Sequence, residues 1–157
     1  MARYYKKKFV RGSRDKYSVE HKAGNVLSDA TSGDGGVVIV PSTTVEGMRK
    51  VKHIVVNLAA NDVSGAYDHA LFWAIVYVPQ GTTVNPLQVD SGTMYEPNQF
   101  VMGCGVADFN GGPLRVHCRM SRNLNSGDQI YFLVHKSNPG GVASSYQYAI
   151  SYAVTLQ

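Results

Sequence analysis

The sequence is poor in cysteine and in long hydrophobic stretches, and each shortage excludes a class of protein. The two cysteines, Cys104 and Cys118, can form one disulfide at most, which is too little for a disulfide-dependent scaffold. The simplest interpretation is a protein made and assembled in a reducing compartment. The longest apolar stretch lies around Leu71–Val78 and falls far short of the roughly 20 residues that cross a bilayer. We therefore expect no membrane partner.

Catalytic and metal-binding motifs are also missing from the sequence. It has no phosphate-binding glycine loop, no nucleophile elbow and no zinc-protease motif. His117 and Cys118 are adjacent, and neighbouring strand residues point to opposite faces, so they cannot share one metal ion. Asp62, Asp68 and His69 could form a hydrolytic cluster in one loop, but the segment lacks a nucleophile, and Asp62 and Asp68 are ordinary turn residues. We expect no enzyme activity, no cofactor and no metal, with Cys118 a core thiol and the five histidines surface or hydrogen-bonded residues.

What the chain does have is the signature of an all-β fold. Sixteen glycines and ten tyrosines indicate tight turns between aromatic, β-rich segments. Short alternating or continuous apolar segments predict about eight strands, which suits an antiparallel sandwich or barrel. We expect one domain over residues 17–157, preceded by an arm over residues 1–16. The expected strands cover residues 16–22, 37–40, 49–58, 70–78, 99–106, 114–120, 129–136 and 145–156.

Three local patterns add detail to this prediction. Residues 24–36 are rich in turn formers, so we expect a loop there. Gly103 and Gly105 within one strand indicate a bulge or a close backbone approach. Strict alternation in residues 49–58 predicts one core face, made of Lys52, Ile54, Val56 and Leu58.

Positive charge is concentrated at the N-terminal end. Residues 1–22 carry eight Lys or Arg against two acidic residues, a net charge of +6, whereas residues 23–157 carry seven against nine, a net charge of −2. Clustered cations bind phosphates by releasing counterions, and aromatic rings among them stack on unpaired bases. We expect residues 1–16 to bind single-stranded nucleic acid, with a nuclear-import signal or a plain solvated tail as alternatives. The expected contact residues are Arg3, Tyr4, Tyr5, Lys6, Lys7, Lys8, Arg11, Arg14 and Lys16.

Two segments carry a family resemblance. Tyr77-Val78-Pro79 with the following Gly81-Thr82, and the later Tyr95-Glu96-Pro97-Asn98-Gln99 before an apolar strand, resemble capsid proteins of small circular Rep-encoding single-stranded DNA viruses, of the circovirus-like and nanovirus-like kind. The resemblance covers roughly residues 52–157. It implies an eight-stranded jelly roll, sixty copies in an icosahedral shell, and a basic arm that faces a packaged DNA genome.

The resemblance leads to two further expectations about sites. Sixty arms of +6 neutralise only about 360 phosphates. We therefore expect either a short packaged segment or a second basic patch on the inner shell surface, made of Lys50, Lys52, Arg115 and Arg119. Pro97 cannot donate to a β-ladder, so the segment around it is expected to be a loop. In a shell this loop would contribute to an inter-subunit contact through Tyr95, Glu96, Pro97 and Asn98.

The leading functional hypothesis is a self-assembling capsid subunit that packages circular single-stranded DNA. Its expected partners are the genome, further copies of the chain, and host attachment or nuclear-import factors, and its expected location is the virion, with the host nucleus during assembly. The alternative is a monomeric β-barrel that binds single-stranded nucleic acid. The tyrosines of residues 145–156 lie in a nearly uncharged segment, which disfavours a base-stacking sheet.

Overall fold

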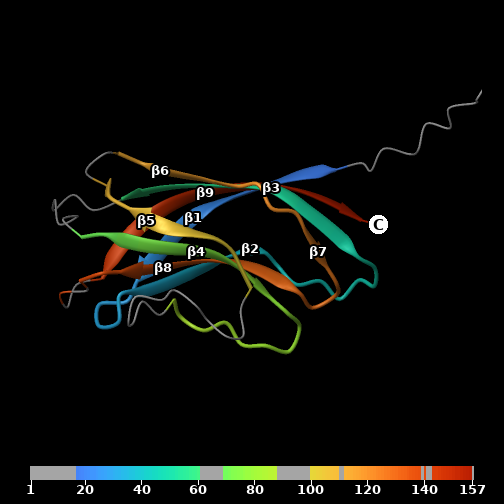
Figure 1. Cartoon of the computed structure of the whole chain (residues 1–157), viewed down its shortest axis with the longest axis horizontal. Coiled ribbons are helices and arrows are strands. Elements are labelled where there is room, and N and C mark those ends of the chain that lie inside the picture. The colour runs from blue at the N-terminus through green and yellow to red at the C-terminus, as the bar shows by residue number, and fades with distance from the viewer. Residues whose placement is uncertain are drawn as a thin grey trace, which may run out of the picture.

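The structure is a computed structural model that describes residues 17–60, 69–87, 100–109, 112–138, 140 and 143–156. Within these residues the chain forms two antiparallel β-sheets packed face to face (Figure 1). None of the residues described forms a helix long and apolar enough to span a membrane. The strands are β1 (Ser18–Ser28), β2 (Asp34–Val40), β3 (Arg49–Ala60), β4 (Leu71–Val78), β5 (Phe100–Ala107), β6 (Leu114–Cys118), β7 (Arg122–Leu124), β8 (Gln129–Lys136) and β9 (Ser144–Leu156).

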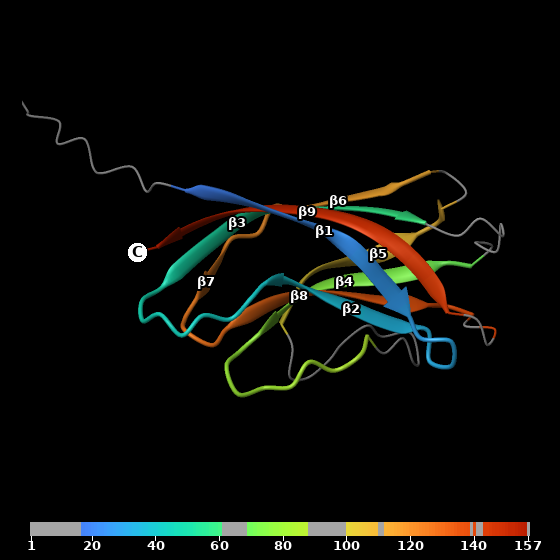
Figure 2. The same cartoon turned by 180° about the vertical axis from the view of Figure 1, so that it is seen from behind.

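The strand order defines a jelly roll. Sheet A has the order β1-β9-β3-β6, with the short β7 also paired to β3, and sheet B has the order β2-β8-β4-β5. The chain passes from one sheet to the other at most connections, so that β1 to β4 alternate between the layers; Figure 2 shows the same two layers from behind. The predicted all-β, antiparallel jelly roll is therefore confirmed. The described residues contain nine strands rather than eight, because β7 was not predicted.

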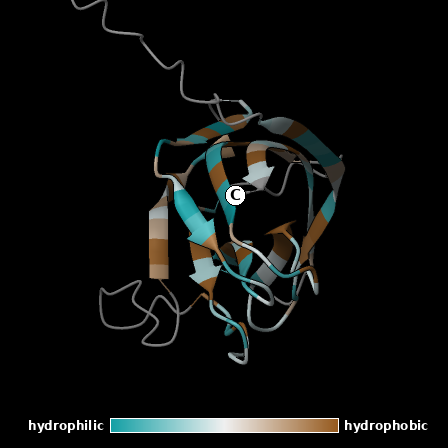
Figure 3. Cartoon of the chain, turned by 90° about the vertical axis from the view of Figure 1, so that its right-hand side faces the viewer, coloured by the Kyte–Doolittle hydropathy of each residue, from teal (hydrophilic) through white to brown (hydrophobic). Residues whose placement is uncertain are grey.

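The core lies between the two sheets. Every second residue of β9 faces inward, so that the tyrosines of this strand fill the core together with aliphatic residues of β3 and β8. Hydrophilic and hydrophobic bands alternate along the strands (Figure 3), as expected where one face of a sheet is buried. The largest buried aromatic side chains are Tyr146 and Phe132, both 0% exposed.

The two outer faces differ. The outer face of sheet B carries a second apolar cluster, in which Ala74, Val76 and Leu133 pack against Leu87 and Val84 of the segment after β4. Sheet B is thus covered on both sides, which explains why almost every residue of β4 is buried. No second apolar cluster of the described residues lies on the outer face of sheet A. Ala23, Asn57, Ala149 and Arg115 on that face are exposed, and it is the open face of the sandwich.

One expectation about the core face was wrong in part, and a β-bulge explains why. Ile54, Val56 and Leu58 are buried as predicted, but Val51 is buried in place of Lys52. The register with β9 shifts between Lys52 and Val55, and His53 has a φ of 55°. The extra residue inverts the alternation at this point, so that Lys52 lies on the outer face.

The other differences concern strand limits. The expected loop over residues 24–36 is confined to residues 29–33, because β1 runs to Ser28 and β2 begins at Asp34. Asp29 closes this turn, since its carboxylate accepts hydrogen bonds from the amides of Thr31 and Ser32, at 2.8 and 2.9 Å. These bonds hold the pKa of Asp29 below its ordinary value.

The glycines of β5 have the roles that the sequence indicates. The register between β4 and β5 shifts between Ile75 and Val76, opposite Gly103, which marks a bulge. A Cβ atom on Gly105 would lie 2.7 Å from the Trp73 ring. The absence of a side chain at residue 105 therefore lets the indole lie flat against β5.

Candidate nucleic-acid interface

The open face of sheet A is built from cross-strand rows whose members follow from the register. Alternation along each strand places these residues on the side opposite the core. Small residues of β9 occupy the centre of the face, and the flanking strands β1, β3 and β6 contribute four polar or basic residues together with Ala23 and Val55. One row is His21, Ser151, Val55 and His117, and the next is Ala23, Ala149, Asn57 and Arg115.

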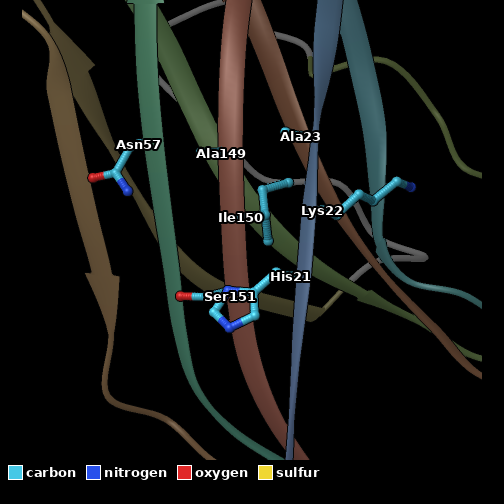
Figure 4. Close-up of a pocket in the computed structure, with 7 residues that line it drawn as sticks. All are labelled: His21, Lys22, Ala23, Asn57, Ala149, Ile150 and Ser151. Carbon is cyan, nitrogen blue, oxygen red and sulfur yellow. The ribbon is translucent and has the colours of Figure 1, made fainter.

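A groove of about 330 Å³ lies on this face. Its floor includes Ala149 and Ser151 of β9, with His21 of β1 on one side and Asn57 of β3 on the other (Figure 4). The two flanking strands are two places apart in the sheet, which corresponds to about 9–10 Å. The depth of the groove comes from sequence, because alanine and serine on the central strand leave room between longer side chains.

The charge of this face is positive. Arg115 is exposed beside Asn57, and the Nζ atom of Lys52 lies 3.4 Å from the centroid of the Tyr17 ring. None of the described residues in the two rows is acidic. The nearest acidic residue on β1 is Glu20, which pairs with Tyr152 on the opposite face.

The structure places the four residues of the predicted second patch in different settings. Lys50 and Lys52 are on one side of β3 by alternation, and both are half-buried. Arg115 lies on the open face, and Arg119 is exposed just after β6. Lys52 and Arg115 thus share the open face, whereas Lys50 also lines a separate recess.

That recess is a polar cavity of about 510 Å³ beside β7. Arg122, which sequence reasoning missed, lies over two aromatic rings, with its guanidinium carbon 4.1 Å from the Tyr77 centroid and 5.2 Å from the Phe100 centroid. The recess therefore holds two cations among neutral polar groups. Its lining residues are Lys50, Tyr77, Ser121, Arg122, Asn123 and Asn125.

A buried carboxylate fixes the wall of the recess. Asp128 accepts hydrogen bonds from the Tyr77 hydroxyl at 2.8 Å, from the Asn125 amide at 2.8 Å and from the Gln80 amide at 3.0 Å. Burial, together with the bond to Asp128, raises the pKa of Tyr77 above its ordinary value. The arrangement holds the turn before β8 against the end of β4.

The remaining ionisable candidates have structural contacts. The Nε2 atom of His69 lies 2.8 Å from the Tyr146 hydroxyl, and the Nδ1 atom of His135 lies 2.8 Å from the Asp34 carboxylate. Cys118 is buried, as predicted for a core thiol, and Cys104 is exposed. In the part of the chain that the structure describes, no three His, Cys, Asp or Glu residues are placed to hold a metal ion.

Several predicted site residues lie outside the described residues. These are the arm over residues 1–16, the loop formed by Tyr95, Glu96, Pro97 and Asn98, and the turn residues Asp62 and Asp68. The described chain begins at Tyr17, whose ring lies under Lys52.

Comparison with known proteins gives a fold and no family. No family model and no curated protein matches the sequence. A chain in the structure of infectious bursal disease virus Gt strain matches with a TM-score of 0.53 and 12% identity, over 91% of this chain and 34% of that chain. This chain thus spans about a third of the length of that neighbour.

A turnip yellow mosaic virus chain matches with a TM-score of 0.48 and 11% identity, over 92% and 95% of the two chains. A Yersinia pseudotuberculosis-derived mitogen matches with a TM-score of 0.31 and 13% identity, over 90% and 88%. At these identities the first match supports the shared jelly-roll fold.

Proposed function

We propose that the protein is a structural subunit of a viral capsid. Many copies assemble into a closed icosahedral shell, of sixty subunits in its smallest form, which packages circular single-stranded DNA. The observation that carries the proposal is the combination of a jelly roll with an attached arm of high positive charge. A fold likeness to a chain from a virus structure and the sequence resemblance to capsid proteins of Rep-encoding viruses support it.

The charge distribution is suited to packaging. A net charge of +6 in residues 1–22 stands against −2 in the rest of the chain, so the attraction to nucleic acid is strongest in the N-terminal segment. The second basic patch adds Lys52 beside the start of the described chain and Arg115 further along the open face. Host import factors that recognise basic segments are proposed partners of the same arm.

The monomeric nucleic-acid-binding barrel is the weaker proposal. A base-stacking sheet needs exposed aromatic rings among its cations. The β9 residues Tyr146, Tyr148 and Tyr152 are all buried in the core. Among the residues described, the two central rows of the open face hold no Phe, Tyr or Trp.

Electron microscopy of the purified full chain tests the capsid proposal. Uniform closed particles are the expected result. A protein that stays monomeric under all conditions of salt and pH would refute a shell and leave the barrel as the better account.

Deletion of residues 1–16 tests the packaging role. Particles of the truncated chain should contain much less nucleic acid than those of the full chain, measured by the ratio of absorbance at 260 and 280 nm and by extraction. Circular dichroism serves as the control, because the β-fold should persist without the arm. Equal nucleic-acid content in both particles would contradict the role of the arm.

The loop around Pro97 stays a prediction. If it contributes to a contact between subunits, Glu96→Ala combined with Asn98→Ala should lower the yield of particles without lowering the melting temperature of the subunit. A normal yield of particles would show that the loop only joins two strands.

A further inference from the structure

We propose that the groove along β9 on the open face of sheet A binds the sugar–phosphate backbone of single-stranded nucleic acid. The inference rests on the proposed packaging function and names its contact site within the folded domain. The site consists of His21, Ser151 and Asn57, which line the groove, and of His117 and Arg115, which continue the same two rows on β6.

Three features of the groove indicate this ligand. Its floor is made of Ala149 and Ser151, so an extended chain can lie along β9 without displacing a large side chain. Its walls offer hydrogen-bond donors, namely the Asn57 amide and the imidazole of His21. The guanidinium of Arg115 lies one strand further out, on β6 beside Asn57. Donors of this kind serve as phosphate and sugar contacts in nucleic-acid complexes.

The charge of the open face favours nucleic acid, rather than a second copy of the chain, as the ligand of the groove. The two described rows hold basic and neutral side chains and no carboxylate. Two such faces brought together would set like charges against each other, whereas a phosphate backbone complements them. The same face carries Lys52, whose Nζ atom lies over the ring of Tyr17, where the described chain begins.

The form of the site predicts how it recognises its ligand. The groove is about 9–10 Å between the flanking strands, a width that fits one strand lying along β9. Its two described rows contain no aromatic residue, so it offers no platform for base stacking. We therefore expect binding that depends on salt, is indifferent to sequence and favours single strands over duplexes.

Substitutions at the floor test the proposal on the full chain. Ala149→Glu places a negative charge in the groove. Ala149→Lys places a positive charge there, on a long side chain at the same residue. Ala143→Glu is the matched control, because Ala143 is also an exposed alanine but precedes β9 and lies outside the groove. The probe is a fluorescein-labelled oligothymidylate, and its affinity is measured by fluorescence anisotropy at several salt concentrations. Circular dichroism and melting curves verify that each variant is folded.

The expected result separates charge at the groove from charge elsewhere. Ala149→Glu should weaken binding about tenfold, and Ala149→Lys should weaken it clearly less, because its charge attracts phosphate although its side chain also fills the floor. Ala143→Glu should stay within about twofold of the parent. Arg115→Ala should lower the slope of log affinity against log salt by about 0.7, the value for one phosphate contact on a single strand. Parental affinity of Ala149→Glu, or equal weakening by Ala149→Glu and Ala143→Glu, would overturn the proposal.

Particle formation is followed in parallel by sedimentation. This measurement distinguishes failure of the groove proposal from failure of the capsid proposal. If the parent forms particles with nucleic acid and Ala149→Glu packages the same amount, the groove fails and the capsid proposal stands. If the parent neither assembles nor binds the oligonucleotide, the capsid proposal itself fails.

Discussion

Among single substitutions of polar side chains, the loss of Asp128 should destabilise the folded domain most. It is 3% exposed, and its carboxylate accepts the bonds from Tyr77, Asn125 and Gln80. In Asp128→Ala the Tyr77 hydroxyl is left buried without its acceptor, which costs about 1–3 kcal/mol. The amides of Asn125 and Gln80 belong to exposed residues and can bind water instead, at about 0.5–1 kcal/mol each. The expected loss in the free energy of unfolding is therefore about 3 kcal/mol.

Urea unfolding followed by tryptophan fluorescence measures this loss. Trp73 is the single tryptophan, and its ring stacks on Phe132 of the core at a centroid distance of 6.3 Å, so it reports on global unfolding. With a slope of about 2 kcal/mol per molar urea, the midpoint should fall by about 1.5 M. Parent and variants are compared at one protein concentration, because assembly would couple stability to concentration.

A double-mutant cycle identifies the cause. In the parent, Tyr77→Phe should cost about 1 kcal/mol by removing a hydrogen bond. In the Asp128→Ala background the same change should be neutral or stabilising, since it removes an orphaned hydroxyl. A midpoint shift below about 0.3 M for Asp128→Ala, or additive effects of the two changes, would refute this reasoning.

Three further predictions concern single sites. Gly105→Ala should destabilise the domain by about 1–3 kcal/mol, because its Cβ atom would lie 2.7 Å from the indole ring, whereas Gly103→Ala, whose Cβ atom has no contact closer than 3.9 Å, should cost clearly less in the same urea assay. In the native protein a maleimide should label the exposed Cys104 rapidly and the buried Cys118 only after unfolding, as measured by mass spectrometry; equal labelling rates would contradict the fold. Burial raises the pKa of Tyr152 above 10.0, so the folded state holds that proton more tightly. The stabilisation from the protonated Tyr152 hydroxyl is complete below pH 10 and is lost as pH rises through the higher folded-state pKa. Tyr152→Phe should therefore reduce the fall in the free energy of unfolding at alkaline pH, measured by urea unfolding at a series of pH values.

The sequence predicted the sheets well because alternation and turn formers report directly on strands with one buried face. The β8 strand has the predicted limits, and Cys118 lies in the core as its phase indicates. Two failures have local causes. The bulge at His53 inverts the phase of β3, and a single register slip leaves no signal in the spacing of residues. β7 is three residues long, too short to show a period.

The candidate site was harder to predict, because it depends on which strands are neighbours. His21 and Asn57 are 36 residues apart in the sequence and flank the same groove only because β9 inserts between β1 and β3. Ala149 and Ser151 carry no chemical signal of their own. Arg115 was predicted from its charge and phase, whereas Arg122 could not be, since its role comes from the ring of Tyr77 in the other sheet.

The mass of the purified full chain in solution tests the central claim most directly. Sixty copies of a 17.1 kDa chain make a protein shell of about 1 MDa, to which packaged nucleic acid adds. Analytical ultracentrifugation should show a discrete species of at least this mass, with an absorbance ratio that falls when residues 1–16 are removed. A single species at the mass of one chain, under every condition in which the protein is folded, would contradict the capsid account.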